Sequence, residues 1–137
     1  MEGEAGLKAN ARIRFALVAI LAVGLAGCET TGTRSGPAVS ALSAGVLSSD
    51  FGSGLDPRAR KLAANAEFVA LETGRAGAEI PWKASETVYG SVIPQQPYQV
   101  GSSNCRRYVH TITQNGQSRS TAATACRNAD GIWVPLS

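Results

Sequence analysis

The stretch "NCRRYVHTITQNGQSRSTAATACRNADGIWVP", residues 104–135, decides the fold because it predicts three consecutive antiparallel strands. Asn115-Gly116 lies between two runs of strand-forming residues and is the strongest short-range signal for a two-residue hairpin turn. Asp130-Gly131 marks a second turn before the short run Ile-Trp-Val. The C-terminal part of the chain is therefore predicted to be β structure.

The predicted hairpin sets the positions of two cysteines. Counting outward from Gln114 opposite Gln117, the strands place Cys105 directly opposite Cys126. The register makes this a non-hydrogen-bonded pair, with Cα atoms about 4.5 Å apart, at the short edge of the disulfide range. A bulge would shift the pairing by one residue. We expect a structural disulfide, since a redox pair is usually Cys-x-x-Cys and zinc needs about four ligands.

A helix is predicted before these strands, within the segment "LDPRARKLAANAEFVALETGRAG". Asp56 is placed to cap it, Pro57 suits its first position and Gly74 suits its end. Its apolar stripe is mostly alanine, so we expect it to pack on a sheet, while Phe68 and Leu71 indicate contact on a second side. The stripe comprises Leu55, Ala59, Leu62, Ala63, Ala66, Val69 and Ala70.

Another strand is predicted in "ETVYGSVIP", where small or polar and apolar residues alternate. Pro94 and Pro97 are expected to mark its end, because proline cannot donate a hydrogen bond to a sheet. The predicted fold class is α+β, with one N-terminal helix packed on a small antiparallel sheet of about four strands.

The N-terminus has the layout of a secretory signal. Basic residues precede the apolar run at 15–27. A helix needs about 20 apolar residues to cross a membrane, so this run is too short to span one. The run ends in Leu25-Ala26-Gly27-Cys28, which resembles the bacterial lipobox, whose cysteine carries diacylglycerol after cleavage. Cys28 is the predicted lipidation site. The alternative is an ordinary cleavable signal followed by a chance cysteine.

These features predict three parts: a lipoprotein signal peptide at 1–27, a tether rich in Gly, Ser and Ala at 28–54, and a domain at 55–137. Within the tether, "AVSALSAGVL" has the small-residue spacing of close-packed membrane helices, yet it is too short to span a membrane. It is interpreted as a flexible linker or a frayed helix. Three basic and two acidic residues lie in 1–27, so the mature chain is nearly neutral, which disfavours nucleic acid as a partner.

No group of residues in the sequence predicts catalysis. His110 is the chain's one histidine and lies on a predicted strand, where we expect a packed or solvent-facing residue and not a general base. No nucleophile with a base, paired carboxylates or metal ligands occur at usable spacing. We expect no enzyme activity and no cofactor or metal.

Four arginines give the predicted hairpin a basic character. Arginine forks suit phosphate and carboxylate groups, so lipopolysaccharide or an acidic face of an envelope protein is a candidate partner. An ordinary solvated surface is the alternative. The candidate binding face comprises Arg106, Arg107, Arg119 and Arg127.

Several pieces of residues 53–137 resemble one bacterial family. They are "LDPRARKLA", "ALETGRAG", the isolated Trp82, "YGSVIP", "CRRYVHTI" and "TACRNADGIWVP". These pieces resemble outer-membrane lipoproteins called surface antigens, which are related to the rickettsial seventeen-kilodalton antigen. Relatives often carry a glycine-zipper segment before the helix, of which this chain keeps only "SALSAGVLSSDFGSG", and they tend to have Asn-Pro where it has Lys83-Ala84.

The resemblance implies a lipid-anchored protein of the outer membrane with a small helix-plus-sheet domain and no known reaction. Glu29, which follows the cysteine, is compatible with sorting to the outer membrane by resemblance to enterobacterial lipoproteins. The expected role is structural or interactive within the cell envelope. The alternative is a binding module that inhibits an enzyme or docks on another envelope protein.

Overall fold

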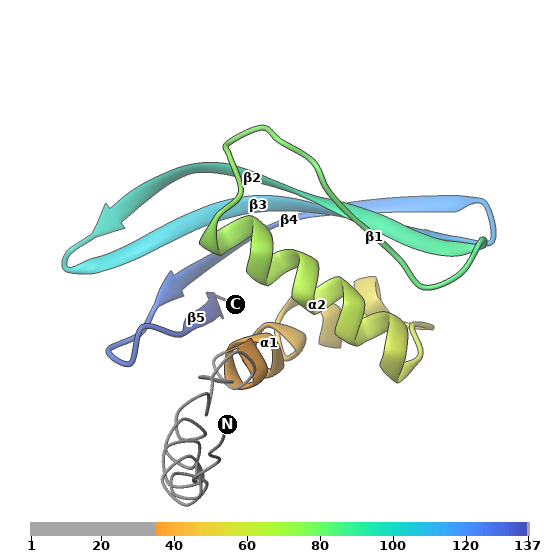
Figure 1. Ribbon diagram of the computed structural model, residues 1–137, viewed down its shortest axis with the longest axis horizontal. Helices are drawn as coiled ribbons and strands as arrows, with labels where there is room; N and C mark the ends of the chain where they lie inside the picture. Colours follow the sequence, from red (N-terminus) through yellow and green to blue (C-terminus); the bar gives the residue numbers. More distant parts are fainter. Residues whose placement is uncertain (1–34, 137) are drawn as a thin grey trace, which may run out of the picture. The chain divides into compact units, whose positions relative to one another are not determined.

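Five antiparallel strands form one sheet in the order β1-β2-β3-β4-β5, with helices α1 and α2 on the same side of it (Figure 1). The computed structural model describes residues 35–136. The α+β prediction is confirmed, with five strands instead of about four. The elements are α1 Ser35–Ser43, η1 Val46–Ser48, η2 Asp50–Gly52, α2 Pro57–Glu72, β1 Ile80–Lys83, β2 Val88–Val100, β3 Ser103–Gln114, β4 Gln117–Arg127 and β5 Trp133–Leu136.

The β3–β4 hairpin has the predicted turn and the predicted register. Asn115 and Gly116 take φ values of 51° and 81°, as a two-residue turn of mirror-image type requires. Pairing runs without a bulge from Gln114 opposite Gln117 to Cys105 opposite Cys126. The turn sequence therefore determines which side chains of the two strands meet.

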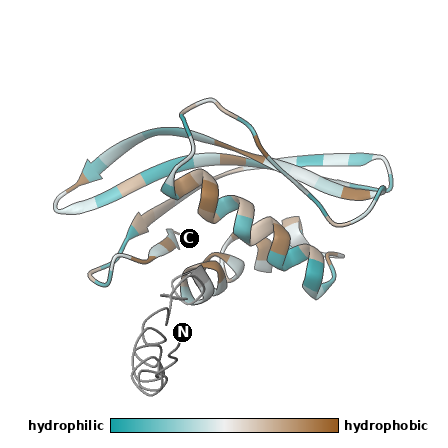
Figure 2. Ribbon diagram, viewed as in Figure 1, coloured by the Kyte–Doolittle hydropathy of each residue, from teal (hydrophilic) through white to brown (hydrophobic). Residues whose placement is uncertain are grey.

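Helix α2 begins where the sequence predicts and lies against the sheet. The Asp56 carboxylate accepts a hydrogen bond from the Ala59 amide at 2.7 Å, which satisfies a free N–H of the first turn. Hydrophobic residues recur along α2 between hydrophilic ones (Figure 2). Small side chains let the helix approach the strands closely, and Leu71 is buried, as contact on a second side requires. The buried residues of α2 are Ala59, Ala63, Ala64, Ala66, Glu67, Ala70 and Leu71.

Strand β2 continues through both prolines, so the prediction that Pro94 and Pro97 end it is wrong. The register against β3 shifts between the two prolines, which marks a bulge. The partner β1 pairs only with Tyr89 to Val92, so the later part of β2 has no strand on that side and loses no ladder bond to proline. The Pro94 carbonyl instead accepts a hydrogen bond from the Gly77 amide at 2.8 Å.

Strand β1 is the strand that the sequence pattern did not predict. It has four residues, Ile80–Lys83, and one of them is proline, so no alternation can develop. Trp82 pairs with Gly90 of β2, and a Cβ atom on Gly90 would lie 2.8 Å from the indole ring. The glycine thus makes room for the buried tryptophan.

Residues 35–54 are not a flexible tether, and the interpretation of 28–54 is corrected over that range. They form α1, η1 and η2, and the side chains of Leu42 and Leu47 are completely buried. Helix α1 contacts both α2 and β5. Although most residues of this segment are small, its two leucines attach it to the domain, because α1 packs closely enough to bury them in the core.

Arg60 of α2 fixes the turns that follow α1. Its guanidinium donates hydrogen bonds to the carbonyls of Leu47, Gly52 and Leu55. The first two carbonyls belong to the short helical turns η1 and η2, and the third belongs to the segment just before α2, so one side chain ties all three to the helix. The folded part of the chain therefore starts well before residue 55. The predicted signal peptide, Cys28 and residues 28–34 lie outside the described residues.

The sheet has two faces of different character, because neighbouring residues of a strand point to opposite sides. We call the face toward α2 the covered face and the opposite face the open face. The covered face carries Val92, Arg106, Tyr108, His110, Ile112 and Ala125. The open face carries Tyr89, Ser91, Cys105, Arg107, Val109, Thr111, Ser120, Ala122, Thr124 and Cys126.

Candidate functional site

A buried polar network joins α2 to the covered face. His110 Nδ1 lies 2.7 Å from Glu67 Oε1, and the Tyr108 hydroxyl donates to Glu67 Oε2 at 3.2 Å. On its other side, the indole N–H of Trp82 donates to His110 Nε2 at 2.9 Å. Glu67, Tyr108 and His110 are completely buried, and Trp82 is nearly so. One helix and two strands thus meet at four hydrogen-bonded side chains.

The donors in this network determine the tautomer of His110. An indole N–H can only donate, so Nε2 of the imidazole must accept and carries no proton. The ring proton therefore lies on Nδ1, which donates to Glu67. The carboxylate accepts from both His110 and Tyr108, and these bonds compensate in part for its removal from water.

Burial also displaces proton equilibria in the network. Desolvation raises the pKa of Glu67 above its ordinary value, although the hydrogen bonds from His110 and Tyr108 act in the opposite direction. Burial raises the pKa of Tyr108 as well, and the Glu67 charge adds to that effect. Both pKa shifts are explained by the burial of these groups within the folded domain.

The network holds the fold together and offers no exposed reactive atom. Among the described residues, no buried side-chain nitrogen or oxygen lacks a hydrogen-bond partner. His110 is packed, and Glu67 is the partner that the sequence analysis missed. A signal existed, since Glu67 lies on the apolar stripe four residues after Ala63 and three before Ala70.

Arg106 is a structural residue, which contradicts its place in the predicted binding face. Its guanidinium donates to the carbonyls of Ala70, Leu71 and Gly74, and to that of Gln95 in the β2 bulge, at 2.6 to 3.1 Å. It therefore supplies donors to the unpaired carbonyls at the C-terminal end of α2. Burial lowers its pKa from the usual value, although the group stays charged.

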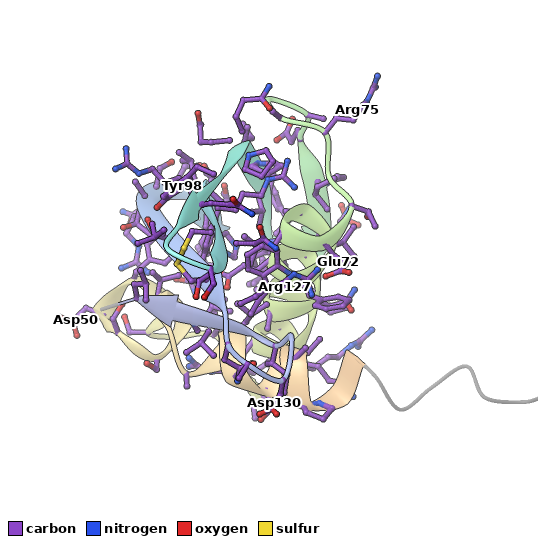
Figure 3. The ribbon with its side chains drawn as sticks, turned by 90° about the vertical axis from the view of Figure 1, so that its left-hand side faces the viewer. Asp50, Glu72, Arg75, Tyr98, Arg127 and Asp130 are labelled. Carbon is purple, nitrogen blue, oxygen red and sulfur yellow. A yellow bond between two sulfur atoms is a disulfide. The ribbon has the colours of Figure 1, made fainter. Side chains whose placement is uncertain are left out.

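Arg127 also makes contacts within the domain. Its guanidinium lies 2.6 Å from a carboxylate oxygen of Glu72 and 4.7 Å from the ring centre of Trp133, and it donates to the Gly131 carbonyl. Figure 3 shows Glu72 and Arg127 side by side. Partial burial acts to raise the pKa of Glu72, but the hydrogen bonds from Arg127 and Trp133 and the charge of Arg127 outweigh it, so the pKa is lowered.

The four arginines consequently do not form one basic face, so the prediction that they share a binding surface is wrong. Arg119 donates to the carbonyls of Asp50 and Phe51 and to the Gln114 side chain. Arg107 alone projects from the open face, where it lies 5.9 Å from the ring centre of Tyr98. Consecutive residues of a strand point to opposite sides, so Arg106 and Arg107 never share a surface.

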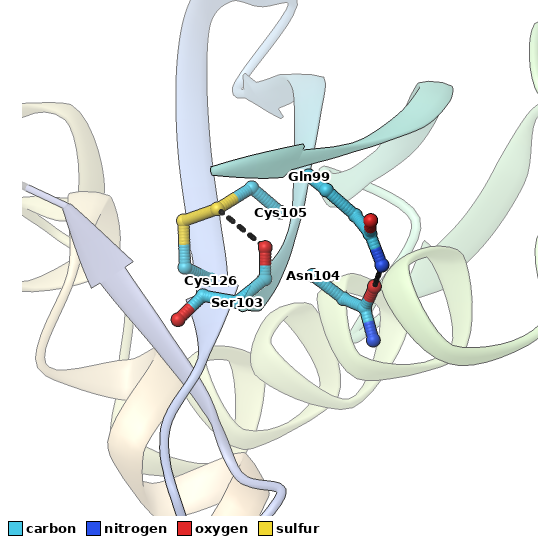
Figure 4. The surroundings of a disulfide bond; sticks show 5 residues. All are labelled: Gln99, Ser103, Asn104, Cys105 and Cys126. Atoms are coloured by element: carbon cyan, nitrogen blue, oxygen red, sulfur yellow. Dashed lines mark hydrogen bonds between the residues drawn. A yellow bond between two sulfur atoms is a disulfide. The ribbon is translucent and has the colours of Figure 1, made fainter. Parts of the chain in front are cut away.

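A disulfide joins Cys105 to Cys126 on the open face (Figure 4). Their Cα atoms are 4.0 Å apart, as a closely spaced non-hydrogen-bonded pair predicts. Beside the bond, the Gln99 side chain donates to that of Asn104 at 3.1 Å across the end of the β2–β3 hairpin. The disulfide fixes the two central strands to each other where the sheet is otherwise exposed.

Two shallow hollows lie on the open face. One has a volume of about 660 Å³ and is bordered by Gln95, Tyr98, Arg107 and Thr124. The other has a volume of about 750 Å³ and lies beside Tyr89 at the opposite end of β2. Figure 3 shows Tyr98 on the side of the sheet away from α2.

Residues 35–136 contain no group of three or more His, Cys, Asp or Glu side chains arranged to hold a metal ion. Among the helices described, none has the length and hydropathy that crossing a bilayer requires.

The chain is similar to known surface antigens. Residues 69–134 match the family described as 17 kDa outer membrane surface antigen. The 17 kDa surface antigen of Rickettsia bellii is 34% identical over 85 residues, which cover 61% of this chain and 54% of that protein. Those of Rickettsia conorii and Rickettsia rickettsii are 34% identical over 82 residues, covering 58% of this chain and 52% of theirs.

The chain spans about half the length of these curated relatives. No solved structure matches it. The matched region contains most of the pieces of sequence that carry the resemblance, including both disulfide cysteines and Tyr108, whereas "LDPRARKLA" at 55–63 lies before it. Residues 69–134 of this chain are thus similar to the family described as 17 kDa outer membrane surface antigen.

Proposed function

We propose that this protein is a lipid-anchored, non-catalytic component of the bacterial cell envelope that acts through contact with other molecules. The family match and the relatives named 17 kDa surface antigen support a surface antigen-like protein. The sequence Leu25-Ala26-Gly27-Cys28 after a short apolar run supports the lipid anchor.

The proposal that the protein is non-catalytic rests on one observation: the residues between α2 and the covered face that could act as acids or bases are buried and paired. Glu67, Tyr108 and His110 are the side chains best suited to acid–base chemistry, and all three are completely buried and bonded to one another or to Trp82. A general base must reach the proton that it removes. These groups instead attach α2 to the sheet.

The anchor and the domain have separate tasks in this proposal. One acyl chain holds a protein to a membrane only marginally, whereas several chains on one cysteine give lasting attachment. The domain is stabilised independently by its core, its network and its disulfide. It is therefore a rigid body that the anchor keeps at the outer membrane.

Radiolabelled palmitate tests the anchor directly. The wild-type chain, expressed in a bacterial host with lipoprotein processing, should take up label and fractionate with the outer membrane. Cys28→Ser should take up none and should appear in the soluble periplasmic fraction or as an unprocessed precursor. Cys105→Ser is the matched control and should still be labelled, because the domain disulfide is not the acylation site. A wild-type chain without label would refute the lipoprotein proposal.

A further inference from the structure

The large exposed hydrophobic residues of the described chain lie on one face of the sheet, toward its ends and its β5 edge. The register places all five large ones on the open face: Tyr89 pairs with Thr113, Tyr98 with Cys105, and Val100 with Ser103, while Val134 and Leu136 pair with Cys126 and Thr124. They are 38% to 59% exposed. An open face that collects exposed apolar side chains is typical of an interaction surface.

Part of this surface is a continuous row across four strands. Tyr98 of β2, Cys105 of β3, Cys126 of β4 and Val134 of β5 are successive neighbours in the sheet. The disulfide lies at the middle of the row, so its backbone is held in one conformation. A surface that is already rigid loses little conformational entropy when it binds.

The two short edge strands of the sheet are poorly suited to pairing with another chain. Both edge strands, β1 and β5, are four residues long, and each contains a proline, Pro81 and Pro135. Short edges with proline are a common device against edge-to-edge association. Beyond these short strands, residues 93–100 of β2 and 117–123 of β4 also have no strand on their outer side, so the open face is the larger but not the sole surface of the sheet that a partner could reach.

The open face has the size of a protein interface. Strands β2, β3 and β4 have 13, 12 and 11 residues. With a rise of about 3.4 Å per residue, a strand spacing of about 4.8 Å and the two short edge strands, the face measures about 700 Å². A stable interface buries about 800 Å² on each partner. A second sheet of the same dimensions would therefore fit the whole face.

Its charges also permit burial against an identical surface. Lys83 is paired with Glu86 at 2.6 Å, which leaves Arg107 and the Glu79 beside β1 as the main single charges. Arg107 makes no ion pair or hydrogen bond with any described residue and stacks near Tyr98. Arginine and tyrosine are enriched at interfaces, whereas closely spaced like charges are not present here to oppose self-association.

We infer that the open face binds the open face of a second copy of this chain, related by a two-fold axis that crosses the strands. Such an axis exchanges the two ends of β2 and places Tyr98 of one copy over the hollow beside Tyr89 of the other. The contact is isologous, as in most homodimers, and closes without leaving a surface for further growth. Two sheets packed in this way form a sandwich, with their mean strand directions within about 30° of each other.

Cross-linking of the full chain in membranes tests this arrangement. Ala122 is exposed at the middle of the face, opposite Val109, so the two-fold axis brings both copies of residue 122 close together. Ala122→Cys should give a covalent dimer with a short bismaleimide. Ala76 is exposed in the turn after α2, and Ala76→Cys is the matched control. It should give no more cross-linked dimer than the chain without an added cysteine. That chain sets the background, which includes any Cys28 thiol left without a lipid.

A second variant keeps the test decisive. Tyr98→Asp in the Ala122→Cys background should reduce the dimer at least tenfold, because it removes the ring that fills the hollow of the partner copy and places a carboxylate close to Glu79 of that copy. Lys61→Glu on the exposed side of α2 should leave the dimer unchanged. Peptide mass analysis should find the bond between Cys105 and Cys126 intact in every variant.

Dimer that forms equally from Ala76→Cys and Ala122→Cys, or that persists with Tyr98→Asp, would overturn the inference. So would a folded Ala122→Cys protein that cross-links to other proteins, or to none, and never to itself.

Discussion

The covered and open faces of the sheet use similar residue types in opposite ways. On the covered face, Arg106 donates four hydrogen bonds to backbone carbonyls and Glu67 accepts from two side chains in the core. On the open face, Arg107 is exposed beside an exposed tyrosine. Two neighbouring arginines thus differ in role because a strand alternates its sides.

The difference shows where the stability of this small domain lies. The covered face packs against an alanine-rich helix, which buries little apolar surface per residue. A polar network adds specific hydrogen bonds between the helix and this face. The open face contributes mainly through one covalent bond. Substitutions on the covered face should therefore lower the free energy of unfolding, whereas those on the open face should alter binding.

Removing the acceptor from the network is expected to have the largest effect. Glu67→Leu leaves the His110 Nδ1–H and the Tyr108 hydroxyl buried without a partner, and each unsatisfied donor costs about 1 to 3 kcal/mol. We expect the free energy of unfolding to fall by about 4 kcal/mol in urea denaturation. Glu67→Gln retains an acceptor for His110 and should cost clearly less. Equal losses for the two variants would mean that the network adds no specific stability.

Breaking the disulfide should have the next largest effect, and it concerns the open face. Cys105→Ser and Cys126→Ser should each lower the free energy of unfolding by roughly 3 kcal/mol, since the closed loop restricts the unfolded chain. The double variant should be no less stable than either single variant, because all three lack the same bond. Thermal melting of the oxidised protein and the three variants measures this. Additive losses would show that the cysteines act independently.

The pH dependence of the network should be a smaller effect. The pKa of Glu67 is raised in the folded protein from its ordinary 4.5, so the folded state keeps this proton to higher pH than the unfolded chain. The stability that protonated Glu67 contributes is present below pH 4.5 and is lost as pH rises through the raised pKa. The wild-type protein should therefore lose stability relative to Glu67→Gln over that window. Urea denaturation at several pH values measures the difference, and a constant or opposite trend would contradict the assignment.

Much of the fold was predictable from local sequence. The turn at Asn115-Gly116 set the register of β3 and β4, and Asp56 with Pro57 set the start of α2. These features are local, because a cap or a two-residue turn depends on backbone geometry within a few residues. The α+β class followed from them.

The elements that were missed depend on tertiary contacts. Strand β1 is too short to show alternation and exists because Trp82 fits over Gly90. Residues 35–52 resemble a linker in composition, yet they fold because α2 and β5 give Leu42 and Leu47 a place to be buried. No local pattern contains that information.

The candidate site was predictable only in part. The disulfide followed from the hairpin, whereas the basic face failed because all four arginines were treated as one exposed group. Alternation alone separates Arg107 from Arg106, which shares its side of β3 with Tyr108 and Ile112. The pairing of Glu67 with His110 joins residues 43 positions apart and needed the folded structure.

The most direct test of the division between the two faces compares Arg106→Met with Arg107→Met in the same urea denaturation experiment. Arg106→Met should lower the free energy of unfolding by about 3 kcal/mol or more, because buried carbonyls at the end of α2 lose their donors. Arg107→Met should change it by less than about 0.5 kcal/mol, as is usual for an exposed side chain. Equal losses for the two variants, or a larger loss for Arg107→Met, would contradict the account.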